Sequence, residues 1–268
     1  MERWQKLAGG SALAFALVAG AAGQATAAPI IDTWNYTLDN AFTEWNPDTV
    51  IGSDPNAELG GATRLEWPAS FDGERSALEV DSVASGTVDT NGAAAPGATL
   101  THFNFPIPTS LESEFLTDGR LSVQATLTPN TPPESGSVGP ITTFFDFLFN
   151  ETPNVADCGF PSSSNCDDLF VLAASGDLSQ DFTFLDEIYT LTFGSEELAP
   201  LDAATCSLVG LDAGCIGFLT TENGITNFET FITVTGPTGP SPVPEPGMLI
   251  LLGTGLVALG AVRRRKAA

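Results

Sequence analysis

The sequence is short of histidine and of basic residues, and both shortages exclude classes of function. Its 268 residues include one histidine, His102, and nine Lys and Arg against 33 Asp and Glu, for a formal net charge of −24. Nucleic-acid binding is excluded, because phosphate recognition needs a basic face. A single imidazole excludes motifs such as H-E-x-x-H, and the sequence has neither a G-x-S-x-G elbow nor a G-x-x-x-x-G-K-[ST] loop. We therefore expect no catalytic residues and a protein that is not an enzyme.

The few basic residues are unevenly placed, and their placement indicates membrane targeting. Residues 29–242 contain no Lys and only three Arg against 31 acidic residues, a net charge of −28. The other basic residues form two clusters, one near the N-terminus and one at residues 263–266, and each flanks an apolar segment. Disorder of the long segment between the two clusters is excluded, because 43% of all residues are hydrophobic and 18 are Phe.

The N-terminal residues 1–27 are predicted to be a signal peptide. Arg3 and Lys6 precede the apolar stretch 7–22, and Ala25-Thr26-Ala27 supplies small residues where a signal peptidase cleaves. We expect the cut before Ala28, and an uncleaved membrane anchor is the alternative. In both cases the body, residues 28–240, is exported.

The C-terminal residues 241–268 contain three parts in a fixed order. Pro244-Glu245-Pro246 comes first, then the 16 uncharged residues 247–262, and then the run Arg263, Arg264, Arg265 and Lys266. As a helix, such a span measures about 24 Å, which crosses a hydrocarbon core of about 30 Å if the bilayer thins locally. The basic run would act as the stop-transfer signal in the cytoplasm and leave the acidic body outside.

This tail resembles the PEP-CTERM sorting signal of Gram-negative bacteria. The resemblance implies that an exosortase, a membrane transpeptidase, recognises Pro244, Glu245 and Pro246 and removes the tail. The protein would then be anchored only transiently in the inner membrane before it reaches the cell surface or the extracellular matrix. A plain C-terminal membrane anchor is the alternative.

The body is predicted to be all-β, a β-sandwich or jelly-roll-like domain. Short runs rich in β-branched and aromatic residues recur between turn formers, and residues 226–234 alternate as in a half-buried antiparallel strand. We expect turns at 46–48, 53–56, 118–119 and 175–177, and a long surface loop over 128–140. A split into two β-domains near residues 94–97 is the alternative. The clearest predicted strands are 121–128, 141–149, 169–173, 182–185, 188–193 and 228–234.

All four cysteines lie in the exported body, where disulfides persist. Four cysteines allow three pairings. Each local pair brackets a segment with turn formers, so we expect the disulfides Cys158–Cys166 and Cys206–Cys215. A zinc site is disfavoured, because neither spacing is C-x₂₋₄-C.

His102 belongs to a polar pair in an apolar segment. Alternation over residues 101–107 places His102 and Asn104 on one face, and Phe103 and Phe105 on the other. Two such residues can satisfy one another or the backbone, which favours a structural network. A ligand site is the alternative.

Calcium is the one candidate cofactor, and no other metal is expected. Exported acidic β-proteins can bind Ca²⁺ through carboxylate and carbonyl oxygens. No EF-hand spacing is present, so a solvated acidic surface is the competing interpretation. The candidate oxygens come from Asp146, Asn150, Glu151, Asp157, Asp167 and Asp168.

Residues 101–104, Thr-His-Phe-Asn, resemble the signature of the THxN family of PEP-CTERM proteins, whose motif residues here are Thr101, His102 and Asn104. Similar segments accompany it at 63–67, 149–154 and 168–172. The resemblance supplies no catalytic residue. Through the tail, it implies an association with bacteria that make extracellular polysaccharide.

The leading functional hypothesis is a non-enzymatic exported protein at the cell surface, set in extracellular polysaccharide. The alternatives are a secreted carbohydrate-active enzyme with paired carboxylates and a calcium-dependent glycan-binding module. The expected partners are signal peptidase, exosortase, the inner membrane and polysaccharide.

Overall fold

The computed structural model describes residues 29–152, 154, 158–173 and 178–238. The predicted signal peptide and sorting tail lie outside these residues. Ala28–Gly239 form one compact unit. Within the described part of the chain, no helix is long and apolar enough to cross a membrane.

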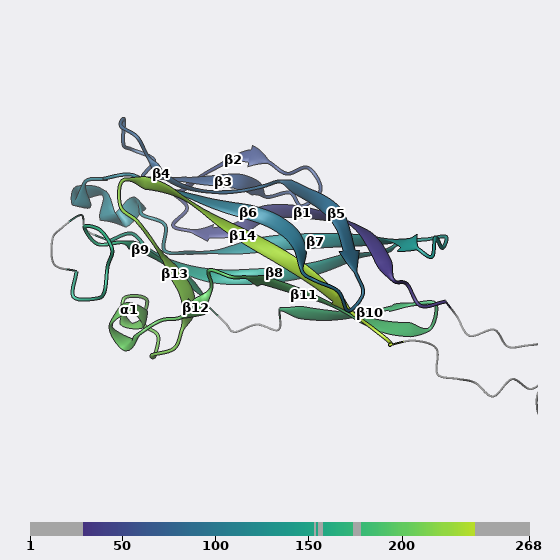
Figure 1. Cartoon of the computed structure of the whole chain (residues 1–268). Helices are drawn as coiled ribbons and strands as arrows, with labels where there is room; N and C mark the ends of the chain where they lie inside the picture. Colours follow the sequence, from purple (N-terminus) through teal and green to yellow (C-terminus); the bar gives the residue numbers. More distant parts are fainter. Residues whose placement is uncertain (1–28, 153, 155–157, 174–177, 239–268) are drawn as a thin grey trace, which may run out of the picture. The chain divides into compact units, whose positions relative to one another are not determined.

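The body is mostly β-structure, which confirms the predicted class, and it contains two short helical segments (Figure 1). These are the 3₁₀ helix η1 (Thr109–Glu114) and the α-helix α1 (Ala203–Ser207). The strands are β1 (Thr33–Asn46), β2 (Ile51–Pro55), β3 (Ala62–Trp67), β4 (Ser76–Val80), β5 (Val83–Asp89), β6 (Ala95–Asn104), β7 (Asp118–Thr131), β8 (Val138–Asn150), β9 (Asp168–Leu172), β10 (Ser179–Phe184), β11 (Glu187–Ser195), β12 (Ala199–Pro200), β13 (Ile216–Thr220) and β14 (Gly224–Thr235).

The strands form one continuous antiparallel sheet that curls over itself. Its order is β10-β11-β14-β6-β4-β3-β1-β7-β8-β9-β13-β12, with β2 beside β3 and β5 beside β1. The two halves face one another through aromatic rings: Phe145 of β8 lies 5.8 Å from Phe193 of β11, and Phe218 of β13 stacks on Phe228 of β14. β6 begins at Ala95 and pairs with both β4 and β14, so the sheet continues through residues 94–97.

Two groups of buried side chains fill the space inside the curl, and a tryptophan lies in each. Trp34 packs edge-on against Phe182 and Tyr189, at 5.5 and 5.1 Å between ring centroids. Trp67 packs against Phe149 at 5.1 Å. Burial of aromatic surface at this density supplies most of the driving force for folding, because many short strands have little stability alone.

The β-rich runs located six strands, but turn residues were less reliable guides. The strands predicted over 121–128, 141–149 and 228–234 are all present. The turn predicted at Asp118-Gly119 is wrong, because β7 pairs there with β1 on one side and β8 on the other. The turn expected at 53–56 begins only at Asn56, since β2 runs through Pro55 beside β3.

The loop predicted over 128–140 is too long. β7 continues to Thr131 and β8 starts at Val138, so strand covers both ends of the proline-rich stretch. Pairing of β7 with β1 up to Thr33 extends the strand in spite of the local prolines.

The turn at 46–48 follows the end of β1 as predicted, whereas 175–177 lies outside the described residues.

Two disulfides join Cys158 to Cys166 and Cys206 to Cys215. The second connects α1 to the residue before β13, and Asp202 caps α1 by accepting hydrogen bonds from the backbone N–H groups of Ala204 and Thr205. Both links are local, with sequence separations of 8 and 9.

Replacing Cys206 and Cys215 by Ser together is expected to lower the free energy of unfolding by about 2–3 kcal/mol, because a closed loop of about ten residues no longer restricts the unfolded chain. Urea unfolding of the oxidised wild type and of the double variant measures the loss. Reducing the wild type should cost at least as much, since both links then open. Equal unfolding midpoints before and after reduction would contradict this expectation.

Candidate functional site

The candidate site lies where several strands end on the same side of the curled sheet, near the labels β4 and β9 in Figure 1. β3 ends at Trp67, β6 at Asn104 and β13 at Thr220, while β9 begins at Asp168. In the ladder between β9 and β13, Asp168 lies opposite Thr220. This register brings together residues that are far apart in the sequence.

His102 lies on the inner face of β6, as its alternation predicts, and it is completely buried. Its ring stacks on Trp67 and meets Phe149 edge-on, with centroids 5.9 and 5.1 Å away. Burial lowers the pKa of His102 to about 3, because the apolar surroundings disfavour the imidazolium. The ring is therefore neutral at physiological pH.

The Thr220 hydroxyl holds His102 at Nδ1. It lies 2.8 Å from this nitrogen and 3.4 Å from the carbonyl oxygen of Asp168. In the tautomer with the proton on Nδ1, the hydroxyl accepts from Nδ1–H and donates to that carbonyl oxygen. His102 Nε2 then has a free lone pair, which faces Asp168 Oδ2 at 3.9 Å.

Glu151 follows the end of β8 and is held by polar groups from β3 and β4. Trp67 Nε1 donates to its Oε2 at 2.8 Å, and the Ser76 hydroxyl lies 3.5 Å from its Oε1. Burial raises the pKa of Glu151 to about 8, and the nearby charge of Glu222 adds to the rise. At neutral pH this carboxyl therefore holds a proton for much of the time.

Asp168 is the third member of the cluster and is fully buried. Its Oδ1 accepts from the Thr152 backbone N–H at 2.7 Å and from the Thr152 hydroxyl at 3.2 Å. Burial and the neighbouring Glu151 raise the pKa of Asp168 well above its usual range. His102, Glu151 and Asp168 each offer one ligand atom, and these three atoms lie within 4.8 Å of one another.

The segment closed by Cys158–Cys166 approaches this cluster through Asp167. The Asp167 carboxylate accepts hydrogen bonds from the backbone N–H groups of Ser163 and Ser164, at 2.8 and 3.0 Å. The Ser164 hydroxyl in turn accepts from the Glu222 backbone N–H at 2.9 Å, between β13 and β14. Burial, then the charge of Asp167, raise the pKa of Glu222 to about 7.

The calcium candidates do not form one site. Asp146 lies at the surface, where Arg120 holds it through two hydrogen bonds of 2.6 and 3.2 Å. The Asp167 carboxylate accepts hydrogen bonds from serines, among them one from the Ser163 hydroxyl. Asp157 lies outside the described residues. Glu151 and Asp168 do meet, but deep in the protein and beside His102.

Sequence analysis named His102, Glu151 and Asp168 separately, without placing them together. It missed Trp67, Ser76 and Thr220, which orient the cluster. The motif residue Asn104 also points inward: its Nδ2 donates to the Thr220 carbonyl oxygen at 3.3 Å. Thr101 lies on the other face of β6, where its hydroxyl donates to Asn227 Oδ1 at 3.1 Å.

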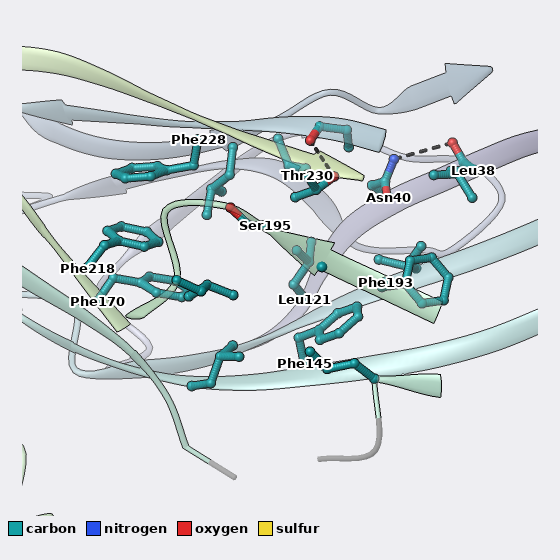
Figure 2. Close-up of a pocket in the computed structure, with 18 residues that line it drawn as sticks. Leu38, Asn40, Leu121, Phe145, Phe170, Phe193, Ser195, Phe218, Phe228 and Thr230 are labelled. Atoms are coloured by element: carbon teal, nitrogen blue, oxygen red, sulfur yellow. Dashed lines mark hydrogen bonds between the residues drawn. The ribbon is translucent and has the colours of Figure 1, made fainter. Parts of the chain in front are cut away.

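A separate apolar pocket of about 90 Å³ lies inside the curl (Figure 2). Figure 2 shows Phe170, Phe218 and Phe228 along one side and Phe145 and Phe193 along another. Its polar lining comes from Asn40, Ser195 and Thr230, and none of the described lining residues is charged. This pocket can accept an apolar group.

Comparisons with known proteins identify a known motif in one segment of the chain. Residues 242–266 match the family model of the PEP-CTERM protein-sorting motif. A search of curated proteins found no match to the chain. The match covers Pro244, Glu245 and Pro246, the uncharged span and Arg263 to Lys266. The motif implies a protein that is sorted by exosortase and exported to the cell surface through a C-terminal anchor.

Proposed function

We propose that the exported body is a non-enzymatic protein of the THxN group that works within extracellular polysaccharide. The sorting motif at residues 242–266 carries the proposal, because it directs the body to the compartment where such polysaccharide lies. The body is acidic, with disulfides that suit an extracellular setting.

The burial of the cluster formed by His102, Glu151 and Asp168 favours this function over that of a glycoside hydrolase. A hydrolase needs two carboxyl groups that both reach the glycosidic bond in an open cleft. Glu151 and Asp168 are the carboxyls that lie together beside the histidine, yet they are 8% and 0% exposed. A polysaccharide chain does not reach them, which supports a structural role for the cluster.

Fractionation of the producing cells tests the proposed function. We expect the processed body to sediment with the extracellular matrix and to be released when the matrix polysaccharide is digested enzymatically. Chelation with EDTA should leave it in place, whereas release by EDTA would favour a calcium-dependent glycan-binding module. Turnover of a glycan panel by the purified protein would favour the carbohydrate-active enzyme. Recovery in the supernatant before digestion would contradict the association with polysaccharide.

A further inference from the structure

Two buried polar atoms face one another in the cluster with no hydrogen-bond partner. They are His102 Nε2 and Asp168 Oδ2, both on side chains with no exposed surface. Buried polar atoms are nearly always paired, because leaving one unsatisfied is costly. The same site contains Glu151, whose ligand oxygen lies within 4.8 Å of both other ligand atoms. A group that bonds to both atoms would satisfy them.

A hydrogen bond between the two atoms does not account for the geometry. Their separation of 3.9 Å is too long for an N–H···O bond. In the tautomer with the proton on Nδ1, Nε2 presents a lone pair toward the carboxyl group of Asp168. A cation that displaces the proton of this carboxyl group would bind both atoms.

The separation fits two ligands of one metal ion. Zinc binds imidazole nitrogen at about 2.0–2.1 Å and carboxylate oxygen at about 2.0–2.2 Å, so two such ligands lie at most about 4.3 Å apart. The observed 3.9 Å falls inside that limit and corresponds to a wide angle at the ion.

We propose that His102, Glu151 and Asp168 bind one divalent first-row transition-metal ion, with Zn²⁺ as the representative probe. Imidazole nitrogen together with carboxylate oxygen suits such ions, whereas Ca²⁺ and Mg²⁺ prefer oxygen ligands alone. The site draws on β6, the residue after β8 and the start of β9. The ion would join these elements, and the burial of all three side chains gives it a structural role.

The surroundings hold each ligand in place, as outer groups do in metal sites. The Thr220 hydroxyl holds His102 at Nδ1, Trp67 Nε1 holds one oxygen of Glu151, and the Thr152 backbone N–H holds Asp168 Oδ1 and leaves Oδ2 free. These contacts preform the site. Asn104 Oδ1, on the next inward residue of β6, is also buried without a partner.

The proposal is tested with the full chain, solubilised in mild detergent, stripped with a chelator and refolded with Zn²⁺, Co²⁺, Ca²⁺ or Mg²⁺. We expect one Zn²⁺ per chain after dialysis by elemental analysis, a higher melting temperature, and visible absorption bands with Co²⁺ that report nitrogen and oxygen ligands. Ca²⁺ and Mg²⁺ should give neither retention nor stabilisation.

Matched variants separate this site from the acidic surface. Glu151→Gln keeps an acceptor for Trp67 and Asp168→Asn keeps the side-chain shape, so both should fold, yet each should weaken Zn²⁺ binding about 100-fold or more. Thr220→Val should weaken it about 10–100-fold, as loss of an outer partner does. Glu229→Gln, which removes an exposed glutamate on β14, should bind like the wild type. Absence of a retained ion in the wild type, or equal retention in wild type, Glu151→Gln and Asp168→Asn, would overturn the proposal.

Discussion

The metal-free protein is expected to lose stability as the pH rises from about 4.5 to 8. Glu151 is the main cause, because its pKa is about 8 in the folded protein against an ordinary value of 4.5. Between these pH values the folded state keeps a proton that the unfolded state releases, so the stabilisation present below pH 4.5 disappears as the pH passes 8. A difference of about 3.5 units corresponds to about 5 kcal/mol.

The other groups around Glu151 shape the profile. Asp168 has a raised pKa and acts in the same direction, as does Glu222 up to its pKa of about 7. His102 acts oppositely: its pKa falls from 6.5 to about 3, so its contribution is lost as the pH drops from 6.5 toward 3. Below pH 6.5, the contribution of His102 to the pH dependence of stability therefore cancels that of one carboxyl group. The steepest loss of stability should therefore fall between about pH 6.5 and 7, and the loss should continue to about pH 8.

Urea unfolding in EDTA from pH 4.5 to 8.5 measures this profile, with tryptophan fluorescence as the probe because Trp34 and Trp67 are both buried. Glu151→Gln should flatten the fall, because glutamine has no proton to release. Glu229→Gln, which removes an exposed glutamate on β14, should leave the profile unchanged. A wild-type midpoint that stays constant or rises between pH 6.5 and 8 would show that the buried carboxyls are not held in their protonated form.

The local pattern of the sequence placed six of the strands, β7 to β11 and β14, but did not order them. Alternation put His102 and Asn104 on one face, and both are buried there. Proline, glycine and aspartate were misleading at 118–119 and in 128–140, since a strand with neighbours on both sides is stabilised by its ladder more than by local propensity. Register and the curl of the sheet depend on contacts between distant segments, which no local window contains.

The same reason explains why the site was found only in pieces. Thr226 pairs with His102, Asn150 with Leu169, and Thr220 with Asp168. These registers together bring the histidine to the two carboxyls. Sequence reasoning named Glu151 and Asp168 as oxygen ligands from their acidity alone. It had no signal for burial at the end of β8 or for the role of Thr220.

The largest effect on the fate of the protein is expected for Glu245→Ala, which should block processing and leave the full-length chain in the inner membrane. Glu245 lies within the matched sorting motif and outside the described residues. Its flanking residues, Pro244 and Pro246, fix φ and disfavour a helix, so the segment should be extended at the membrane surface. In an extended segment, the backbone and the Glu245 carboxylate are both accessible to a processing enzyme. In a helix, the backbone groups would be hydrogen-bonded to one another.

The change should leave membrane insertion intact, because insertion depends on a different part of the tail. We expect the uncharged residues 247–262 to enter the bilayer and the run from Arg263 to Lys266 to hold their end in the cytoplasm. Deleting residues 247–268 should therefore give the opposite result and release soluble body. Recognition and insertion are thus separable by variants that differ only in the tail.

Fractionation of a host that contains the exosortase, followed by a blot against the body, distinguishes the two functions of the tail. Wild type should yield the shorter processed form at the surface, and Glu245→Ala the longer form in the inner membrane. Ser241→Ala, a change in the Pro- and Gly-rich residues before the sorting motif, should be processed like the wild type. Because the two variants differ in neither hydrophobic span nor basic run, a difference between them reports recognition alone. Normal processing of Glu245→Ala would show that the enzyme does not read this carboxylate.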